Sequence, residues 1–195
     1  MKRLLDLTIS IVLVFLLFFP CLIICILIVL DSRGGIFYTT SRVGKNKKIF
    51  KMYKFRTMQI NTPIINSNDL KEPDRYITKI GKILRRFSID EVPQIMNILL
   101  GDMSLVGPRP ALYNQYDLIE KRELSRIFSI KPGLTGLAQI NGRDNLNTDE
   151  KVKYDNDYKT NQSTILDIKI IIKTIFVVLK SKDVRHWIKK LKFCF

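Results

Sequence analysis

The chain has 195 residues, which suits one domain with a modest core and leaves no room for a second domain of similar size. Its formal charge is +15, so an anionic partner is expected: nucleic acid, membrane lipid or a phosphorylated substrate. The apolar residues, 46% of the chain, are unevenly spread, and their placement favours the membrane.

The first predicted element is an apolar helix, since residues 7–30 contain no charged side chain. A helix of that length, at about 1.5 Å per residue, is long enough to cross a hydrocarbon core of roughly 30 Å. Lys2 and Arg3 precede the run, as in a secretory signal. However, the run is longer than a signal-peptide core and no small-residue cleavage site follows it, so we expect it to be retained.

Pro20 lies inside this run and predicts a break or kink, because it lacks an N–H and clashes with the carbonyl of Leu16. Both flanks are cationic, which would hold both in the cytoplasm. A re-entrant helix that enters and leaves on one side satisfies that tendency and is favoured, while a kinked span is the alternative. The cations after the run are Arg33, Arg42, Lys45, Lys47, Lys48, Lys51, Lys54 and Arg56.

Residues 36–58 predict two short strands around the turn-like "GKNKK". Alternation along "FKMYKFRTM" places Lys54 and Arg56 on one face of the second strand. Two cations so spaced could hold a diphosphate, although a solvated strand edge has the same pattern.

Helical spacing then predicts one helix over 74–88 and another from about residue 90 to Gly101. Between them stand two adjacent carboxylates, Asp90 and Glu91. One interpretation is a capping box, with Ser88 as the cap and Glu91 three residues later. The other is a nucleophile beside a metal ligand, in a phosphate site at a helix start.

An Asp attacks an anionic phosphate only if cations neutralise the charge, and Arg85, Arg109 and Arg143 are candidates for that task. Arg109 lies in the Pro/Gly-rich stretch "GDMSLVGPRP", and a second such stretch, "KPGLTGLAQINGR", ends at Arg143. Loops of this composition commonly carry functional sites.

The last predicted helix, "STILDIKIIIKTIFVVLKSK", sets lysines on one stripe and apolar residues elsewhere. It fits an amphipathic helix in the membrane interface and a packed core helix equally well. The tail "DVRHWIKKLKFCF" mixes aromatic and cationic residues and favours a membrane surface.

Taken together, these motifs resemble the bacterial sugar transferases that are monotopic polyprenyl-phosphate phosphoglycosyl transferases. The resemblance covers nearly the whole chain. It includes the basic N-terminus before a Pro-containing apolar helix, and the blocks "IFKMYKFRTM", "GKILRRFSIDEVPQIMNILLGDMSLVGPRP", "KPGLTGLAQINGR" and "DNDYKTNQSTILDIKII".

The resemblance implies an α-rich α+β fold: a Pro-broken re-entrant helix at 1–33, and a catalytic domain at 34–195 with a short β-hairpin and amphipathic interfacial helices. It places the protein on the cytoplasmic face of the bacterial inner membrane, with anionic lipid around it and dimers in some members. No nucleic-acid partner is expected.

For the reaction, the resemblance implies that Asp90 attacks the β-phosphate of a UDP-sugar, UMP leaves, and polyprenyl (undecaprenyl) phosphate takes the sugar phosphate. Such a step begins the assembly of capsule, exopolysaccharide or lipopolysaccharide. Glu91 would bind Mg²⁺. The candidate phosphate or nucleotide contacts are Lys54, Arg56, Arg85, Arg109 and Arg143.

Two other functions share the charge pattern. A membrane-anchored binding protein would explain the cations but gives no reason for Asp90 and Glu91. An ordinary glycosyltransferase would move the sugar alone. The leaving nucleotide separates the three hypotheses: UMP, UDP or none.

Overall fold

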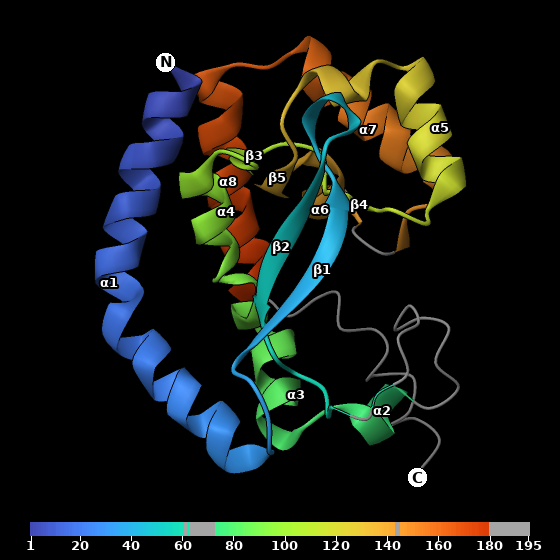
Figure 1. The fold of residues 1–195 in the computed structure, drawn as a ribbon. Helices are drawn as coiled ribbons and strands as arrows, with labels where there is room; N and C mark the ends of the chain where they lie inside the picture. The colour runs from blue at the N-terminus through green and yellow to red at the C-terminus, as the bar shows by residue number, and fades with distance from the viewer. Residues whose placement is uncertain (61, 63–72, 143–144, 180–195) are drawn as a thin grey trace, which may run out of the picture.

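The computed structural model describes residues 1–60, 62, 73–142 and 145–179. A long helix, α1 (Lys2–Asp31), runs along one side of a smaller body of helices and strands (Figure 1). The predicted α-rich α+β class is confirmed by this arrangement. The C-terminal tail, where the sequence predicts a membrane surface, lies outside the described residues.

The break predicted at Pro20 is not evident, because α1 is one continuous helix with Pro20 inside it. A proline costs the helix one hydrogen bond, and the helix can continue if it bends. Figure 1 shows such a bend, with α1 bowed around the body. By length and composition α1 is able to cross a membrane, and its apolar stretch is almost entirely exposed.

The N-terminal end of α1 is fixed to the body by buried polar contacts. Lys2 forms an ion pair of 2.6 Å with Asp167, which lies in α8 (Thr164–Leu179). Asp6 is 3% exposed and accepts hydrogen bonds from the Ser104 hydroxyl and the Leu105 N–H. These partners satisfy a carboxylate that would otherwise be costly to bury.

The C-terminal end of α1 is fixed to the same body. The buried Arg56 guanidinium donates to the carbonyls of Ser32 at 2.6 Å and Arg33 at 2.8 Å. It thereby satisfies carbonyls that a helix end leaves without intrahelical partners. Asp31 also accepts from the N–H of Ile80, in the first turn of α3 (Lys79–Arg86).

The predicted hairpin is confirmed: β1 (Phe37–Val43) pairs antiparallel with β2 (Ile49–Phe55), and a short 3-10 turn, η1 (Lys45–Lys47), joins them. On the other edge of β1 lies β4 (Ala111–Leu112). A separate parallel pair, β3 (Ser104–Val106) and β5 (Gly133–Thr135), comes from the Pro/Gly-rich stretches. Those stretches were predicted as loops, and their strands are too short to show periodicity.

The region predicted as one helix over 74–88 contains two, α2 (Pro73–Tyr76) and α3. After α3 come a 3-10 turn, η2 (Ile89–Glu91), and α4 (Gln94–Leu100). The remaining elements are α5 (Tyr116–Leu124), η3 (Ile127–Ser129), α6 (Leu137–Asn141) and α7 (Thr148–Thr160).

The core lies between the hairpin, α4, α7 and α8, and includes Met52, Ile98, Met103, Tyr158 and Ile170. The packing of α8 as a core helix is confirmed, and its placement in a membrane interface stays a prediction. One face is buried in this core, while its other face exposes Ile165, Ile168, Ile172, Ile175 and Phe176. An exposed apolar face beside the apolar α1 marks a surface suited to lipid.

Candidate active site

The two carboxylates lie in η2, between α3 and α4, rather than inside an α-helix. Ser88 has a φ of 55° and makes no capping hydrogen bond, so the predicted capping box is not formed. Pro93 caps α4, which therefore begins after the carboxylates. A proline is well tolerated where a helix starts, and it confines Asp90 and Glu91 to the short turn.

The turn is seated against the apolar helix. Ile89 and Val92, on either side of the two carboxylates, pack against the cluster that includes Ile28 of α1. These apolar neighbours hold Asp90 and Glu91 beside α1.

Glu91 is held by two cations. Its Oε1 accepts from Lys54 Nζ at 2.8 Å and from Arg109 Nη2 at 2.7 Å, and its Oε2 accepts from Arg109 Nη1 at 3.3 Å. Although burial alone would raise the pKa of Glu91, the charges of Arg109 and Lys54 hold this pKa well below its ordinary value. Glu91 is therefore ionised throughout the physiological pH range.

Asp90 is in a different state although it is the adjacent residue. Its side chain is buried, and Lys54 Nζ lies 3.7 Å from Oδ2. Burial raises the pKa of Asp90 above its ordinary value, and the charges of Lys54 and Arg85 only partly oppose this. Asp90 is thus a poorly hydrated carboxyl group, the condition in which an anionic oxygen is least shielded from an electrophile.

The cations come from elements far apart in sequence. Lys54 lies on β2 two residues after the buried Met52, so it shares the inward face of that strand. Arg85 is in the last turn of α3, where its Nε donates to the Thr57 hydroxyl at 2.9 Å. Burial lowers the pKa of Arg85, and the charge of Asp90 opposes that shift.

Arg42, on β1, is a cation of the site that the sequence analysis did not select. Its Nη1 donates to the carbonyl of Pro110 at 3.3 Å. Burial, together with the charge of Arg109, lowers the pKa of Arg42 to about 10, while the charge of Glu91 opposes the shift. Its Nε is buried without a hydrogen-bond partner among the described residues. Nothing in the sequence separates this arginine from its basic neighbours.

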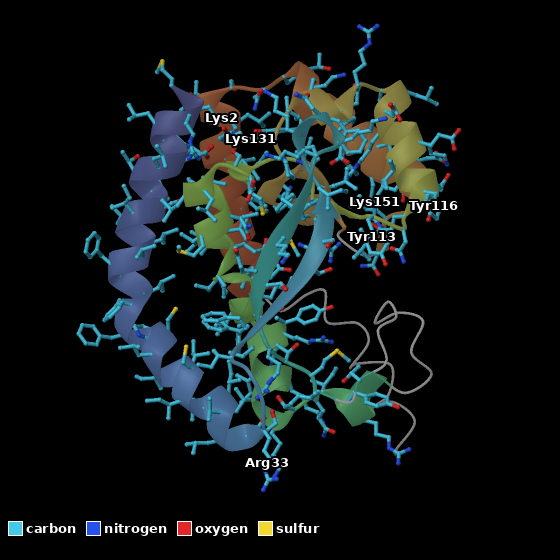
Figure 2. The ribbon with its side chains drawn as sticks, in the orientation of Figure 1. Lys2, Arg33, Tyr113, Tyr116, Lys131 and Lys151 are labelled. Carbon is cyan, nitrogen blue, oxygen red and sulfur yellow. The ribbon has the colours of Figure 1, made fainter. Side chains whose placement is uncertain are left out.

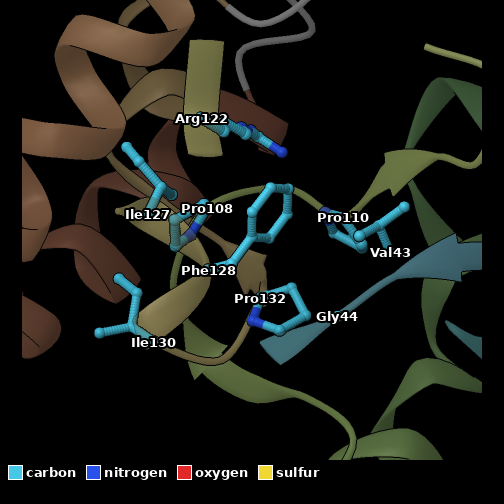
Figure 3. A pocket seen from close by; sticks show the side chains of 9 residues that line it. All are labelled: Val43, Gly44, Pro108, Pro110, Arg122, Ile127, Phe128, Ile130 and Pro132. Atoms are coloured by element: carbon cyan, nitrogen blue, oxygen red, sulfur yellow. The ribbon is translucent and has the colours of Figure 1, made fainter. Parts of the chain in front are cut away.

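The backbone of Arg109 is fixed by a second buried ion pair. Arg122 Nη2 donates to Asp155 at 2.6 Å, and Arg122 Nη1 donates to the carbonyl of Arg109 at 2.8 Å. Pro108 and Pro110 flank Arg109 and line a small pocket, of about 10 Å³, around Phe128 (Figure 3). Two prolines and a buried arginine therefore limit where the Arg109 side chain can point.

The structure brings together five of the predicted site residues, namely Lys54, Arg85, Asp90, Glu91 and Arg109. Arg56 lies elsewhere, since its guanidinium is bonded to the end of α1. Arg143 lies outside the described residues. Among the described residues no group of three His, Cys, Asp or Glu side chains could hold a metal ion. Asp90 and Glu91 supply two carboxylates, a set that Mg²⁺ accepts when substrate phosphates and water complete its coordination.

Comparison with known proteins places this site in context. The family model described as "Bacterial sugar transferase" matches residues 1–181. "Galactosyl transferase CpsE" of Streptococcus agalactiae is 42% identical over 193 residues, which cover 91% of this chain and 42% of that protein. "Uncharacterized sugar transferase EpsL" of Bacillus subtilis is 40% identical over 190 residues, covering 95% of this chain and 91% of EpsL.

A third relative is "Undecaprenyl-phosphate galactose phosphotransferase" of Salmonella typhimurium, which is 35% identical over 195 residues, or 92% of this chain and 40% of that protein. The chain thus spans less than half the length of two of these relatives and nearly all of EpsL.

Proposed function

The chain belongs to the bacterial sugar transferase family, and from that premise we propose that it transfers a sugar 1-phosphate from a UDP-sugar to polyprenyl phosphate, releasing UMP. The product would be a polyprenyl diphosphate-sugar, the starting lipid of a bacterial surface glycan. The Salmonella relative is named an undecaprenyl-phosphate galactose phosphotransferase, which supports both the lipid acceptor and the transfer of a sugar phosphate.

One observation carries the proposal: a buried carboxyl, Asp90, is surrounded by cations and seated against an apolar helix. The cations would receive a diphosphate, and the apolar helix would bring the lipid acceptor. Arg42, whose buried Nε has no hydrogen-bond partner in the part of the chain that the structure describes, adds a donor suited to the same anion.

In the proposed first step an oxygen of Asp90 attacks the β-phosphorus of the UDP-sugar. The P–O–P bridge breaks, UMP leaves, and a phosphosugar remains on Asp90 as an acyl phosphate. In the second step a phosphate oxygen of the polyprenyl phosphate attacks the same phosphorus. The acyl–phosphate bond breaks, the carboxylate is restored, and the diphosphate lipid forms.

Glu91 would hold Mg²⁺, with phosphate oxygens of the donor supplying further ligands. When bound, the metal would neutralise charge on the phosphates. In the structure Lys54 and Arg109 already neutralise Glu91, so the metal would compete with these two ion pairs. Arg109 would then be free to turn to the diphosphate.

The position of α1 supports a placement of the protein in one leaflet of the inner membrane, which we propose to be the cytoplasmic one. A straight helix of this length, about 45 Å, would carry its ends to opposite sides of a hydrocarbon core of roughly 30 Å. Here both ends bond to one polar body. The proposed re-entrant arrangement needs only a bend in α1, and not a break at Pro20.

The test is the identity of the released nucleotide. Detergent-solubilised protein would be mixed with Mg²⁺, undecaprenyl phosphate and a panel of UDP-sugars, and UMP and UDP would be separated. We expect UMP from at least one sugar, together with label from the sugar phosphate on the wild-type protein when the acceptor is omitted.

Asp90→Asn is the decisive variant, because an amide cannot form the acyl phosphate, and Asp149→Asn is its control at an exposed carboxylate. Both UMP release and labelling should disappear in the first and persist in the second. Release of UDP would instead indicate an ordinary glycosyltransferase, and full turnover by Asp90→Asn would exclude the covalent intermediate.

A further inference from the structure

A second cationic hollow lies at the other end of the hairpin. It has a volume of about 330 Å³ and is lined in part by Lys45, Lys48, Phe50, Leu100, Asp102 and Lys131. We call it the basic pocket. Figure 2 shows Lys131 near the end of α1 that carries Lys2.

The basic pocket has more positive than negative charge. Asp102 is its one carboxylate among the described lining residues, against three lysines. Within the described part of the chain, none of these lysines forms an ion pair with a carboxylate. Burial lowers the pKa of Lys131, and the charges of Arg3 and Lys45 lower it further, while the charges of Asp6 and Asp102 oppose the shift. These cations repel one another, and a bound anion would relieve the repulsion.

Gly101 lines the basic pocket, and its lack of a side chain leaves room for nearby cations. A Cβ at this position would lie 3.6 Å from both Arg3 Nη2 and Lys131 Nζ, so the two cations approach Gly101 closely. Its φ of 93° ends α4 in a conformation that favours glycine. Arg3 is held here by the carbonyls of Ile98 and Leu99, the last turn of α4. Of the cations around the basic pocket, Arg3 is therefore positioned by the fold.

The basic pocket is separate from the candidate active site. Phe50 lines it near the start of β2, whereas Lys54 of the active site lies four residues further along that strand. Four residues of strand span about 13 Å. The two sites also lie at opposite ends of α4, since Glu91 precedes this helix and Leu100 ends it.

The rim of the basic pocket includes an exposed apolar side chain. Leu100 lines the pocket and is 64% exposed. An anion that carries an apolar tail would place its charge on the lysines and its tail on Leu100. A free inorganic anion would use the charge alone.

We propose that the basic pocket binds the phosphate group of an anionic membrane lipid and so fixes the N-terminal end of α1 at the headgroup level. The ligand is a structural lipid and not the acceptor of the reaction. This site would orient the body on the membrane by a contact that is independent of Asp90 and Glu91.

The test is a calorimetric titration of the full chain, in neutral detergent, with dihexanoyl phosphatidylglycerol. We expect binding by the wild-type protein and at least about a tenfold loss of affinity in Lys45→Gln/Lys131→Gln, because two charge-assisted contacts are removed. The matched control is Lys151→Gln/Lys153→Gln, which removes the same charge from the first half of α7; Figure 2 shows Lys151 on the side of the body away from α1.

A variant of opposite sign makes the test independent of damage to the fold. Asp102→Asn removes the carboxylate of the basic pocket and should bind the lipid more tightly than wild type does. Equal affinity in the two double variants, or no gain with Asp102→Asn, would overturn the proposal.

Two further probes identify the source of the phosphate. Dihexanoyl phosphatidylcholine, whose headgroup has no net charge, should bind more weakly than the glycerol lipid. If inorganic phosphate binds as tightly as that lipid and displaces it, the pocket takes a free anion and the lipid proposal is wrong.

Discussion

Two neighbouring groups of charged side chains differ in how well their charges balance. Around Asp90 and Glu91 the charges do not balance, because four cations, Lys54, Arg85, Arg109 and Arg42, act on two carboxylates. The neighbouring pair of Arg122 and Asp155 is balanced one to one, and both side chains are almost fully buried.

The difference in charge balance distinguishes the candidate active site from the ion pair that positions Arg109. A balanced pair has no charge left for a ligand, and Arg122 uses its remaining donor on the Arg109 backbone. The unbalanced group has an excess of positive charge, which a bound anion would neutralise. The carbonyl of Arg109 joins the two groups, so each can be changed while the other is observed.

The largest expected effect comes from Asp90→Asn. We expect catalysis to fall by about a thousandfold or more, because the nucleophile is lost. At neutral pH the folded protein should nevertheless become more stable. The folded pKa of Asp90 is raised, so ionisation of this carboxyl costs stability as the pH rises through that pKa, and an amide avoids the cost.

UMP release and thermal unfolding in detergent measure these two quantities on the same preparation. An unfolding temperature below that of wild type would show that the Asp90 charge stabilises the fold, and the contrast with the balanced pair would fail.

Asp155→Asn should instead lower the stability of the fold, although burial raises the pKa of Asp155 as well. It leaves Arg122 buried without its carboxylate, which costs about 3–5 kcal/mol of unfolding free energy. Arg122→Met/Asp155→Leu removes both charges and should recover much of that loss. Denaturant unfolding measures the stability of both variants. If the double variant is no more stable than Asp155→Asn, the unpaired charge of Arg122 is not the cause of the loss.

Arg109→Lys tests the residue that links the active-site charges to the Arg122–Asp155 pair. It keeps the charge and the backbone contact with Arg122 but loses the two-pronged contact with Glu91. We expect kcat/KM to fall about a hundredfold, with little change in unfolding temperature. Arg75→Lys, an exposed arginine of α2, is the control.

The pH dependence of the rate should follow Asp90 alone. Because the pKa of Asp90 is raised and that of Glu91 is lowered, Asp90 loses its charge before Glu91 does as the pH falls. The rate should then fall by up to about tenfold for each pH unit below the Asp90 pKa. A profile with two acidic groups titrating together would contradict this separation.

Arg42→Gln is expected to have the smallest effect. It removes a cation that faces Arg109 and whose Nε has no partner among the described residues. The KM for the UDP-sugar should rise about fivefold, since one charge-assisted contact is lost, while kcat stays near that of wild type. An unchanged KM would show that Arg42 supports the loop at Pro110 without meeting the substrate.

The sequence predicted those parts of the fold that depend on local pattern. The uncharged run showed α1, and the "GKNKK" turn showed the hairpin. The sequence also predicts Asp90 and Glu91, together with Lys54, Arg85 and Arg109, as site residues. This prediction rests on residue types and on the family resemblance.

What the sequence could not show depends on contacts between distant elements. Arg56 matches Lys54 in strand alternation, yet β2 ends at Phe55 and Arg56 turns to the carbonyls of α1. Arg122 and Asp155 lie on different helices and meet only after folding. Ser88 fits the capping-box pattern, but its positive φ makes it the start of a 3-10 turn.

The contacts that close α1 onto the body have a consequence for the order in which the protein assembles. Lys2 and its partner Asp167 are 165 residues apart in the chain. At roughly 5–20 residues per second, the ribosome delivers Asp167 about 8–33 s after Lys2. The apolar helix is therefore made before the body that holds it, and the contact that closes its N-terminal end onto the body forms only after the start of α8 is made.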